Sequence, residues 1–375
     1  MKIVISPDSF KGSLSAAKAA DAIEKGFVNA CTGKTPFEII KCPIADGGEG
    51  TLDALVKPEN IIKTPVNAPN MNKITARFGF VKDTAIIEMA EAAGLTLIPE
   101  SRRDILSATT YGVGEMILSA LEHGYKKIML TVGGSGTNDG GCGMFASLGA
   151  EFRDMNGRDF IPTGGTLKNI VEIDISKLDK RLNDCSFTIA CDVTNPLIGE
   201  MGATKIYSRQ KGADDSAVKL MEKGMINYAE ILYKKSGKNV ALIPGCGAGG
   251  GICAPLLAFL NAEIKSGISA VLSSLNYNKI LKGADFVITG EGKIDAQSAY
   301  GKAISGVSKA AMSMGIPVYC FVGKIGEGAE IMTKCGVCGI YALCDIAESC
   351  QDSIDNAEAL LEKIAFTFAK EKFQI

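Results

Sequence analysis

The chain has 375 residues, 46% of them hydrophobic, which is enough to bury a large core and favours two domains over one. Its 40 basic and 42 acidic residues give a formal net charge of -2 at pH 7, and no basic stretch is interleaved with aromatic residues. Such a chain has no excess positive field to attract a polyanionic backbone. Composition therefore predicts an ordinary soluble globular protein and argues against a nucleic-acid partner.

The first 65 residues alternate between apolar runs and an Ala-rich segment with helical periodicity. We expect a strand at residues 2–6, a helix at 13–30 with Ser13 as its N-cap, and a strand at 37–45. Pro7, Asp8 and Lys11 interrupt the first strand before the apolar core of a signal peptide could develop. We therefore expect no targeting segment and a cytoplasmic location.

The middle of the chain has a different sequence pattern, which predicts short strands separated by many turn residues. We expect strands at 73–81, 84–90, 126–132 and 187–193. We also expect a helix at 107–122 and a second helix that follows the glycine loop at 133–141 and ends at Leu148. Residues 239–260 carry no charge, but two prolines and five glycines interrupt them. A buried strand, loop and helix account for this segment better than a membrane span, so we expect no membrane partner.

The last third returns to alternating strands and helices, which is the pattern of a parallel sheet covered by helices. We expect strands at 284–290, 316–323 and 339–344, and helices at 298–314, 327–335 and 354–371. The predicted fold is α/β with two domains. A Rossmann-like parallel-sheet domain is built from residues 1–65 and 280–375, and a mixed α/β domain, residues 66–279, is inserted between them.

Histidine and cysteine supply little chemistry. His123 is the single histidine and stands at the end of a helix before Gly124, where a cation favours the helix dipole, so we predict a structural role. This argues strongly against Ser-His-Asp and Cys-His catalysis. Most of the twelve cysteines lie in apolar strands or glycine loops, and we predict reduced core residues rather than a zinc cluster.

Glycine gathers with carboxylates or hydroxyls at five strand-to-turn junctions, which are residues 6–13, 45–51, 133–141, 244–251 and 289–298. Ligands of open α/β sheets bind at the carboxyl ends of strands. Glycine lets backbone N–H groups converge on an anion, and a following helix adds its positive dipole end. Any one loop is explained equally well by a tight turn. Five together predict a site for phosphate groups.

Carboxylates in these loops are open to magnesium coordination and to base catalysis. The set consists of Asp8, Asp46, Glu49, Asp139, Asp192, Glu291 and Asp295. Asp139 stands just before a helix and is as well suited to capping that helix as to touching a metal. Lys11 is placed to meet an anion, and Lys293 lies between two acids whose charge it would offset.

Two sequence patterns that are typical of nucleotide-binding proteins bear on the class of enzyme. The chain has no G-x-x-x-x-G-K-[ST], so a P-loop enzyme is excluded. G-x-G-x-x-G does occur, at Gly245, Gly247 and Gly250 behind an apolar run, which keeps an NAD-dependent oxidoreductase of a small hydroxy acid open. A non-catalytic protein that binds phosphometabolites is a further alternative.

Six motifs, taken in order, resemble the type I glycerate kinase family: PDSFKGSLSA, PIADGGEGT, GGSGTNDGGCGM, ACDVTNPLIGEMGAT followed by RQKGA, PGCGAGGG and ITGEGKIDAQS. The resemblance runs from residue 3 to beyond 320; the family pattern has arginine where Lys293 stands. It implies ATP-dependent phosphorylation of D-glycerate to 2-phosphoglycerate with Mg²⁺, in a cleft between the two domains. A kinase for another small hydroxy acid is the nearest alternative.

We assign roles on these loops as a hypothesis for in-line phosphoryl transfer. Asp192 accepts the proton of the glycerate hydroxyl, and Lys11 meets the substrate carboxylate or the transferring phosphate. The magnesium ligands are Asp46, Glu49, Glu291 and Asp295. The residues assigned to substrate and phosphate are Asp8, Ser9, Gly47, Gly48, Gly133, Gly134, Ser135, Thr137, Asn138, Asn195, Gly247, Gly249, Gly250, Gly251, Lys293 and Gln297. The sequence leaves a homo-oligomer open.

Overall fold

A computed structural model describes residues 1–31, 37–48, 50–299 and 302–373, and the chain divides into two compact units. Unit 1 consists of Met1–Asp46, Asp53–Leu55 and Gly267–Ile375, and unit 2 consists of Gly47–Leu52 and Val56–Ser266. Both ends of the chain thus enter one unit. The domain limits expected near residues 65 and 280 remain predictions.

Unit 1 contains a five-stranded parallel sheet in the order β15-β13-β11-β1-β2. Its strands are short apolar runs that are buried in the centre of the sheet, as parallel strands covered on both faces require. They are β1 (Lys2–Pro7), β2 (Glu38–Lys41), β11 (Phe286–Gly290), β13 (Val318–Val322) and β15 (Val337–Ala342). The strand order reverses between β1 and β11, which marks the expected ligand position of such a sheet.

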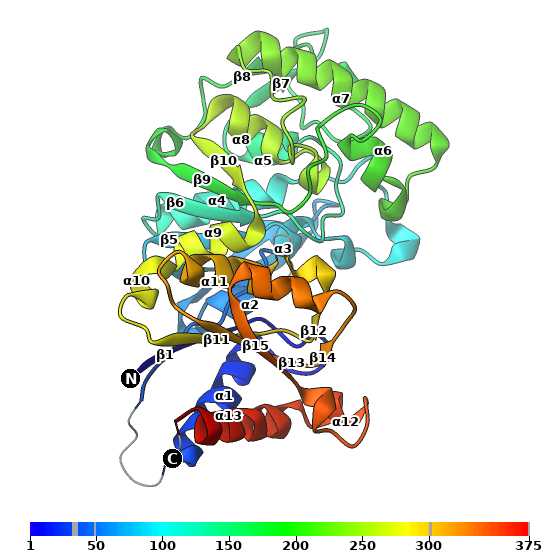
Figure 1. Cartoon of the computed structure of the whole chain (residues 1–375). Coiled ribbons are helices and arrows are strands. Elements are labelled where there is room, and N and C mark those ends of the chain that lie inside the picture. The colour runs from blue at the N-terminus through cyan, green and yellow to red at the C-terminus, as the bar shows by residue number, and fades with distance from the viewer. Residues whose placement is uncertain (32–36, 49, 300–301, 374–375) are drawn as a thin grey trace. The chain divides into compact units, whose positions relative to one another are not determined.

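Helices cover both faces of this sheet (Figure 1). On one face α1 (Ala16–Ala30) and α13 (Ala357–Phe373) pack side by side over the apolar side chains of β1 and β11. On the other face lies α11 (Ala303–Met312). Three further helices are α9 (Gly267–Ser274), α10 (Tyr277–Leu281) and α12 (Asp352–Asp355), and a two-stranded sheet joins β12 (Lys293–Ile294) to β14 (Lys324–Ile325). The α/β fold with a parallel sheet is confirmed.

One local prediction for unit 1 was wrong, and a second holds with a helix of another type. The first helix begins at Ala16 and its N-cap is Ser15, whose hydroxyl accepts from the Lys18 N–H at 3.3 Å, whereas the Ser13 hydroxyl donates to the carbonyl of Ile354. Ser15 precedes the first helical residue directly, which is what capping geometry requires. The segment expected as a helix at 327–335 is a 3₁₀ helix, η9 (Ala329–Cys335), closed by Gly336 at φ +92°.

Unit 2 contains a six-stranded mixed sheet in the order β10-β9-β6-β5-β4-β3. Strands β3 (Ile61–Asn67), β4 (Lys73–Val81) and β5 (Thr84–Glu88) are antiparallel neighbours. Strands β5, β6 (Lys127–Thr131), β9 (Ser186–Ala190) and β10 (Ala262–Lys265) are parallel. A separate antiparallel pair joins β7 (Glu151–Arg153) to β8 (Glu172–Asp174). The predicted mixed character of the middle segment is confirmed.

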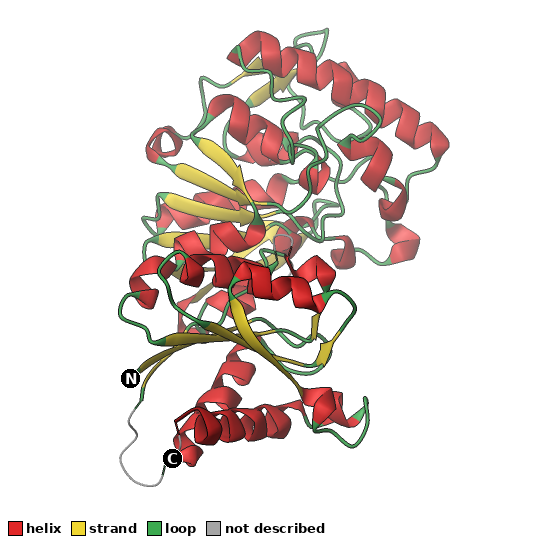
Figure 2. Ribbon diagram, viewed as in Figure 1, coloured by secondary structure: helices red, strands yellow, loops and turns green. Residues whose placement is uncertain are grey.

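The core of unit 2 is formed by the sheet together with α4, α5, α7 and α8, and Figure 2 distinguishes these helices from the strands by colour. The helices of unit 2 are α3 (Ala90–Ala93), α4 (Tyr111–Glu122), α5 (Cys142–Ser147), α6 (Ala203–Tyr207), α7 (Asp215–Ser236) and α8 (Cys253–Phe259), whereas α2 (Thr51–Leu55) has residues in both units. His123 caps α4, with its Nδ1 2.8 Å from the carbonyl oxygen of Ser119, so its structural role is confirmed.

The strand expected before the G-x-G-x-x-G pattern does not exist. Residues 239–247 form irregular chain and turns, and a 3₁₀ helix, η7 (Ala248–Gly250), leads into α8. A dinucleotide fingerprint needs a strand before its first glycine, so this pattern loses the context that would support an NAD site. Among the described residues, no helix is long and apolar enough to span a bilayer.

Candidate active site

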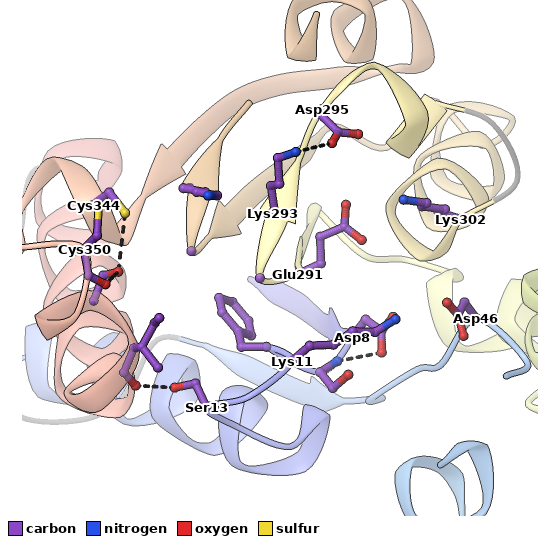
Figure 3. A pocket seen from close by; sticks show the side chains of 17 residues that line it. Asp8, Lys11, Ser13, Asp46, Glu291, Lys293, Asp295, Lys302, Cys344 and Cys350 are labelled. Carbon is purple, nitrogen blue, oxygen red and sulfur yellow. Dashed lines mark hydrogen bonds and ion pairs between the residues drawn. The ribbon is translucent and has the colours of Figure 1, made fainter. Parts of the chain in front are cut away.

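One cavity lies in unit 1, where the parallel strands end, and has a volume of about 420 Å³. We call it the Asp8 pocket (Figure 3). Its wall comes from the residues that follow β1, β2, β11, β13 and β15, because parallel strands bring their carboxyl ends to one edge. It is lined by Asp8, Ser9, Phe10, Lys11, Ser13, Asp46, Glu291, Gly292, Lys293, Asp295, Lys302, Gly323, Lys324, Cys344, Cys350, Ser353 and Ile354.

Two carboxyl groups, of the buried Asp8 and the half-buried Glu291, stand at the reversal of strand order. Asp8 follows β1 and is 7% exposed, and its Oδ1 accepts a hydrogen bond from the Ser9 N–H at 2.6 Å. Glu291 follows β11, and its Oε1 accepts from the Ser298 hydroxyl at 2.6 Å. Burial raises the pKa of Asp8 to about 6 and that of Glu291 to about 6, and neighbouring carboxylates add to both shifts. A cation placed between these groups would stabilise their ionised forms.

Lysines balance the acids of this pocket. Four lysines, Lys11, Lys293, Lys302 and Lys324, line the wall together with four carboxylates. Lys293 Nζ lies 2.8 Å from Asp295 Oδ2, so Lys293 does offset an acidic neighbour. In Figure 3, Ser13, Cys344 and Cys350 lie at one end and Asp46 and Lys302 at the other, so charge is concentrated away from the cysteines.

The carboxylates expected to bind magnesium are distributed around this pocket. Asp46, Glu291 and Asp295 all line it, whereas Glu49 lies outside the described residues. The described part of the chain contains no group of three acidic, histidine or cysteine side chains gathered tightly enough to enclose a metal. Mg²⁺ is commonly held by one or two carboxylates, water and substrate phosphates, and this donor set fits that arrangement.

The second cavity lies in unit 2 and has a volume of about 490 Å³. We call it the Asp192 pocket. Its walls follow the carboxyl ends of the parallel strands β5, β6 and β9, so its position obeys the same rule as the first. It is lined by Gly47, Gly48, Leu95, Thr96, Val132, Gly133, Gly134, Ser135, Ala190, Cys191, Asp192, Val193, Tyr207, Gln210, Lys211, Ala248 and Gly249.

The glycine loop after β6 forms one wall of the Asp192 pocket. Two backbone hydrogen bonds fix it, from Leu95 N–H to Gly134 O at 2.9 Å and from Gly136 N–H to Ala93 O at 2.8 Å. Gly134 adopts φ +69°, a conformation that glycine accepts without strain. Asp192, the expected base, is exposed at the end of β9 and lines the same pocket.

Lys211 is a residue of this pocket that the sequence reasoning missed. It is 3% exposed, and its Nζ donates to Ser135 Oγ at 2.7 Å and to Thr137 O at 2.8 Å. Burial lowers the pKa of Lys211 to about 7. The 3₁₀ helix η6 (Arg209–Lys211) continues from α6, so Tyr207, Gln210 and Lys211 reach the pocket together. The only signal in the sequence was its place in the RQKGA motif.

Glu88 was not identified from the sequence either, because its position at the end of an apolar strand predicts no role in a site. It is 4% exposed and accepts hydrogen bonds from the Leu52 N–H at 2.5 Å and from the Gly50 N–H at 3.3 Å. A buried carboxylate thus holds the backbone of residues 50–52, just beyond Gly47 and Gly48, which line the pocket. By accepting these backbone hydrogen bonds, Glu88 fixes the conformation of the chain next to the pocket-lining residues Gly47 and Gly48.

Several expected binding residues line neither pocket. Thr137 and Asn138 are fully buried, and the Asn138 Nδ2 donates to Thr204 Oγ1 at 3.0 Å. Gly247 and Gly250 pack against backbone, since a Cβ would lie 2.1 Å from Pro196 O and 2.1 Å from Thr137 O respectively. These side chains and glycines serve close packing behind the pocket. Gly251 is also buried, and of this stretch only Ala248 and Gly249 reach the cavity.

Asn195 and Asp139 support the site from behind. The Asn195 Oδ1 accepts a hydrogen bond from the Tyr207 hydroxyl at 2.6 Å, so Asn195 orients a residue of the Asp192 pocket. Asp139 is fully buried and accepts from the N–H groups of Gly141 and Gly143 at 3.0 and 3.2 Å, so it bonds the backbone at the start of α5, although the N-cap residue of that helix is Gly141. The side chain of Gln297 is outside the described parts of the chain.

The pockets thus collect the predicted residues in two separate sets. Asp8, Ser9, Lys11, Asp46, Glu291, Lys293 and Asp295 line the first, and Gly47, Gly48, Gly133, Gly134, Ser135, Asp192 and Gly249 line the second. A charged pocket with carboxylates and lysines in equal number suits a polyphosphate with a divalent cation. A glycine-lined pocket with one lysine and one carboxylate suits a small anion that also has a hydroxyl group.

Comparison with known proteins places the chain in a family. A family model described as the glycerate kinase family matches residues 3–371. The chain is 41% identical to the glycerate 2-kinase of Escherichia coli K12, covering 98% of each chain, and 42% identical to a glycerate kinase of Halalkalibacterium halodurans, covering 98% of this chain and 97% of the other. A crystal structure of a protein described as glycerate kinase 2, from Salmonella typhimurium LT2, matches with a TM-score of 0.87 and 39% identity over the whole of both chains. The chain therefore belongs to the glycerate kinase family.

Proposed function

We propose that this protein transfers the γ-phosphoryl group of ATP to the 2-hydroxyl of D-glycerate and forms 2-phosphoglycerate and ADP. The observation that carries this proposal is the Asp8 pocket, which lies where the parallel strands end and is lined, within the described residues, by four lysines and four carboxylates. Phosphoryl transfer depends mainly on positioning and on neutralising the charge of phosphate oxygens, and a chain with a single structural histidine supplies those means.

Magnesium would be held in this pocket by Glu291, Asp46 and Asp295 together with phosphate oxygens. When bound, it neutralises charge on the phosphates. Lys11 and Lys302 would contact the same phosphates as point charges. Glu49 stays a proposed ligand from the sequence alone. Asp8 lines the same pocket as Glu291, and burial raises the pKa of both carboxyl groups, so we include Asp8 among the groups a cation would stabilise.

The reacting hydroxyl needs a base, and we propose Asp192 for this role. Its carboxylate is exposed at the end of β9, within a pocket whose glycine loop leaves space for a small acid. Asp192 would take the proton of the 2-hydroxyl as the oxygen attacks the γ-phosphorus. Gly133, Gly134 and Ser135 would surround the acid on the opposite wall.

A coupled assay tests the proposal. Purified protein is incubated with ATP, Mg²⁺ and D-glycerate, ADP release is followed, and added enolase reports 2-phosphoglycerate without any mutase. We expect ADP and the enolase signal at equal rates. ADP without the enolase signal would indicate 3-phosphoglycerate and contradict the assigned hydroxyl. Binding of ATP without ADP release in the presence of glycerate would favour a non-catalytic sensor, and faster turnover of another hydroxy acid in a substrate panel would overturn glycerate as the preferred acceptor.

A further inference from the structure

We propose that the Asp192 pocket is the acceptor site of the kinase, and that Lys211 with the backbone N–H groups of residues 133–135 binds the carboxylate of the hydroxy acid. This inference rests on the proposed function and adds a substrate-binding residue to it. It also assigns the two pockets to the two substrates.

Lys211 is a buried cation whose protein partners are neutral. The side chain is 3% exposed, and its two hydrogen bonds go to the Ser135 hydroxyl and the Thr137 carbonyl. Within the described residues, no carboxylate lies at ion-pair distance from its Nζ. An ammonium has three N–H donors, so one remains for a ligand at the pocket wall. Since a buried charge without a counter-ion is costly, an anionic ligand would be stabilised here.

The glycine loop offers further donors beside Lys211. The N–H groups of Gly133, Gly134 and Ser135 donate no hydrogen bond to any described residue, although all three residues line the pocket. The carbonyl of Gly134 and the N–H of Gly136, in contrast, are both bonded, so the loop is held in place. Consecutive unused N–H groups on a fixed loop form a site for a carboxylate or phosphate oxygen.

The balance of charge decides which anion belongs in which pocket. Among the described residues, Lys211 and Asp192 are the charged ones that line the Asp192 pocket, whereas four described lysines line the Asp8 pocket. A single lysine matches the single charge of a carboxylate, and a triphosphate with its metal needs the larger set. When the carboxylate of a small hydroxy acid binds Lys211, the hydroxyl of the same molecule would face Asp192, the proposed base.

The protonation of Lys211 supports the assignment. The titratable and charged groups around it are Asp139, whose field favours the ammonium, Asp192 and the neutral Tyr207 in the same pocket, and Arg103 and Asp104 in a small cavity that Lys211 also lines. Burial lowers the pKa of Lys211 to about 7 in the free protein. Only the protonated amine attracts a carboxylate. We therefore expect kcat/KM for D-glycerate to fall as pH rises above about 7, while the KM for ATP changes little.

The test uses the full chain and the variants Lys211→Met and Lys211→Arg. Lys205→Met is the matched control, because Lys205 lies on α6, pairs with Glu200 at 2.5 Å and lines neither pocket. Losing a charge-assisted hydrogen bond weakens binding about 10- to 100-fold. We expect K211M to raise the KM for D-glycerate by that factor with the KM for ATP within about twofold, K211R to restore part of the loss, and K205M to match the wild type.

Turnover of an acceptor without a carboxylate shows whether Lys211 binds the substrate or only supports the glycine loop. Glycerol has hydroxyl groups but no carboxylate, so the wild type should prefer D-glycerate strongly and K211M should lose most of that preference. If Lys211 only supported the loop, K211M would lower kcat/KM for both acceptors equally. Such a result would overturn the proposal, and so would an unchanged KM for D-glycerate in folded K211M.

Wild-type measurements keep the proposal testable even if K211M fails to fold. D-glyceramide, the neutral amide, should inhibit at least about tenfold more weakly than 3-hydroxypropionate, and inhibition by the latter should weaken above pH 7. Equal inhibition by both compounds would contradict a carboxylate site. Failure of the proposed function would look different, because the wild type would then not phosphorylate D-glycerate at all.

Discussion

The backbone N–H of Asp8 donates a hydrogen bond to the carbonyl oxygen of Gly290, the residue before Glu291, at 2.8 Å. This bond continues the parallel register of β1 and β11, in which Ile3 pairs with Phe286 and Pro7 with Gly290. Two carboxyl groups that are more than 280 positions apart in the sequence thus leave adjacent strands at the same edge. Their placement brings two carboxyl groups into the Asp8 pocket at the point where the strand order reverses.

Glu291→Gln should weaken the dependence of activity on magnesium binding. The amide keeps the size and the hydrogen bond from Ser298 but removes a charge that a cation would pair with. We expect the Mg²⁺ concentration for half-maximal activity to rise about tenfold and EDTA to abolish wild-type turnover. Glu330→Gln, at an exposed position of η9, is the control. An unaltered magnesium titration in E291Q would remove Glu291 from the ligand set.

Asp192→Asn should lower kcat while leaving nucleotide binding intact. Removing a general base costs about 100-fold or more in rate, and the amide cannot accept the proton. The measurements are steady-state turnover, ATP binding by calorimetry and thermal unfolding. Asp184→Asn is suitable as a control, since Asp184 is exposed, forms an ion pair with the surface residue Lys126 and lines neither pocket. Turnover within a few-fold of wild type in a folded D192N protein would rule out the base assignment.

Stability should depend on pH through Lys211. Its pKa is about 7 in the folded protein, against an ordinary value of 10.5. Between these values the unfolded chain binds more protons than the folded one, so the free energy of unfolding rises with pH. Below about pH 7 both states carry the charge and the folded state bears the cost of burying it.

Relative to K211M, the wild type should therefore gain stability from pH 7 to pH 10. Urea unfolding of both proteins at pH 6.5, 8 and 9.5 measures the difference. A difference that stays constant over this range would show that burial does not shift the protonation of Lys211.

Glu88→Ala should destabilise the protein and impair turnover together. It leaves two backbone N–H groups, of Leu52 and Gly50, without their charged acceptor. Loss of hydrogen bonds to a buried carboxylate costs about 2 to 3 kcal/mol in the free energy of unfolding. Glu88→Gln keeps one acceptor oxygen and should cost less. Urea unfolding distinguishes them, and an E88A protein as stable as wild type would show that residues 50–52 are held by other contacts.

Gly26→Ala should destabilise unit 1 although alanine is the better helix former. Gly26 lies within α1, where a Cβ would stand 2.3 Å from the Glu362 carbonyl of α13. Helix propensity favours alanine by about 1 kcal/mol, but such an overlap forces the helices apart and costs about 1 to 3 kcal/mol beyond that gain. A net stabilisation in G26A, measured by urea unfolding, would mean that the two helices separate readily.

The sequence by itself determined the α/β class, the parallel sheet of the chain ends and the family, because local periodicity and contiguous motifs are written in neighbouring residues. It also located Asp8, Glu291 and Asp192 in strand-end loops. It misjudged the run before Gly245, where apolar composition without a partner strand does not make a strand. It misplaced the first helix cap by two residues, since Ser13 and Ser15 are equally plausible by type.

Only the tertiary structure decided which loop residues face a cavity. Thr137 and Asn138 are polar residues of the same glycine loop as Ser135, so the sequence does not distinguish them from it. In the structure their side chains are buried in the core, whereas Ser135 lines the pocket. Lys211 and Glu88 gain their roles from partners that are 76 and 36 residues away. Burial and hydrogen bonding between distant segments depend on how strands and helices pack, and no local pattern in one sequence records that packing.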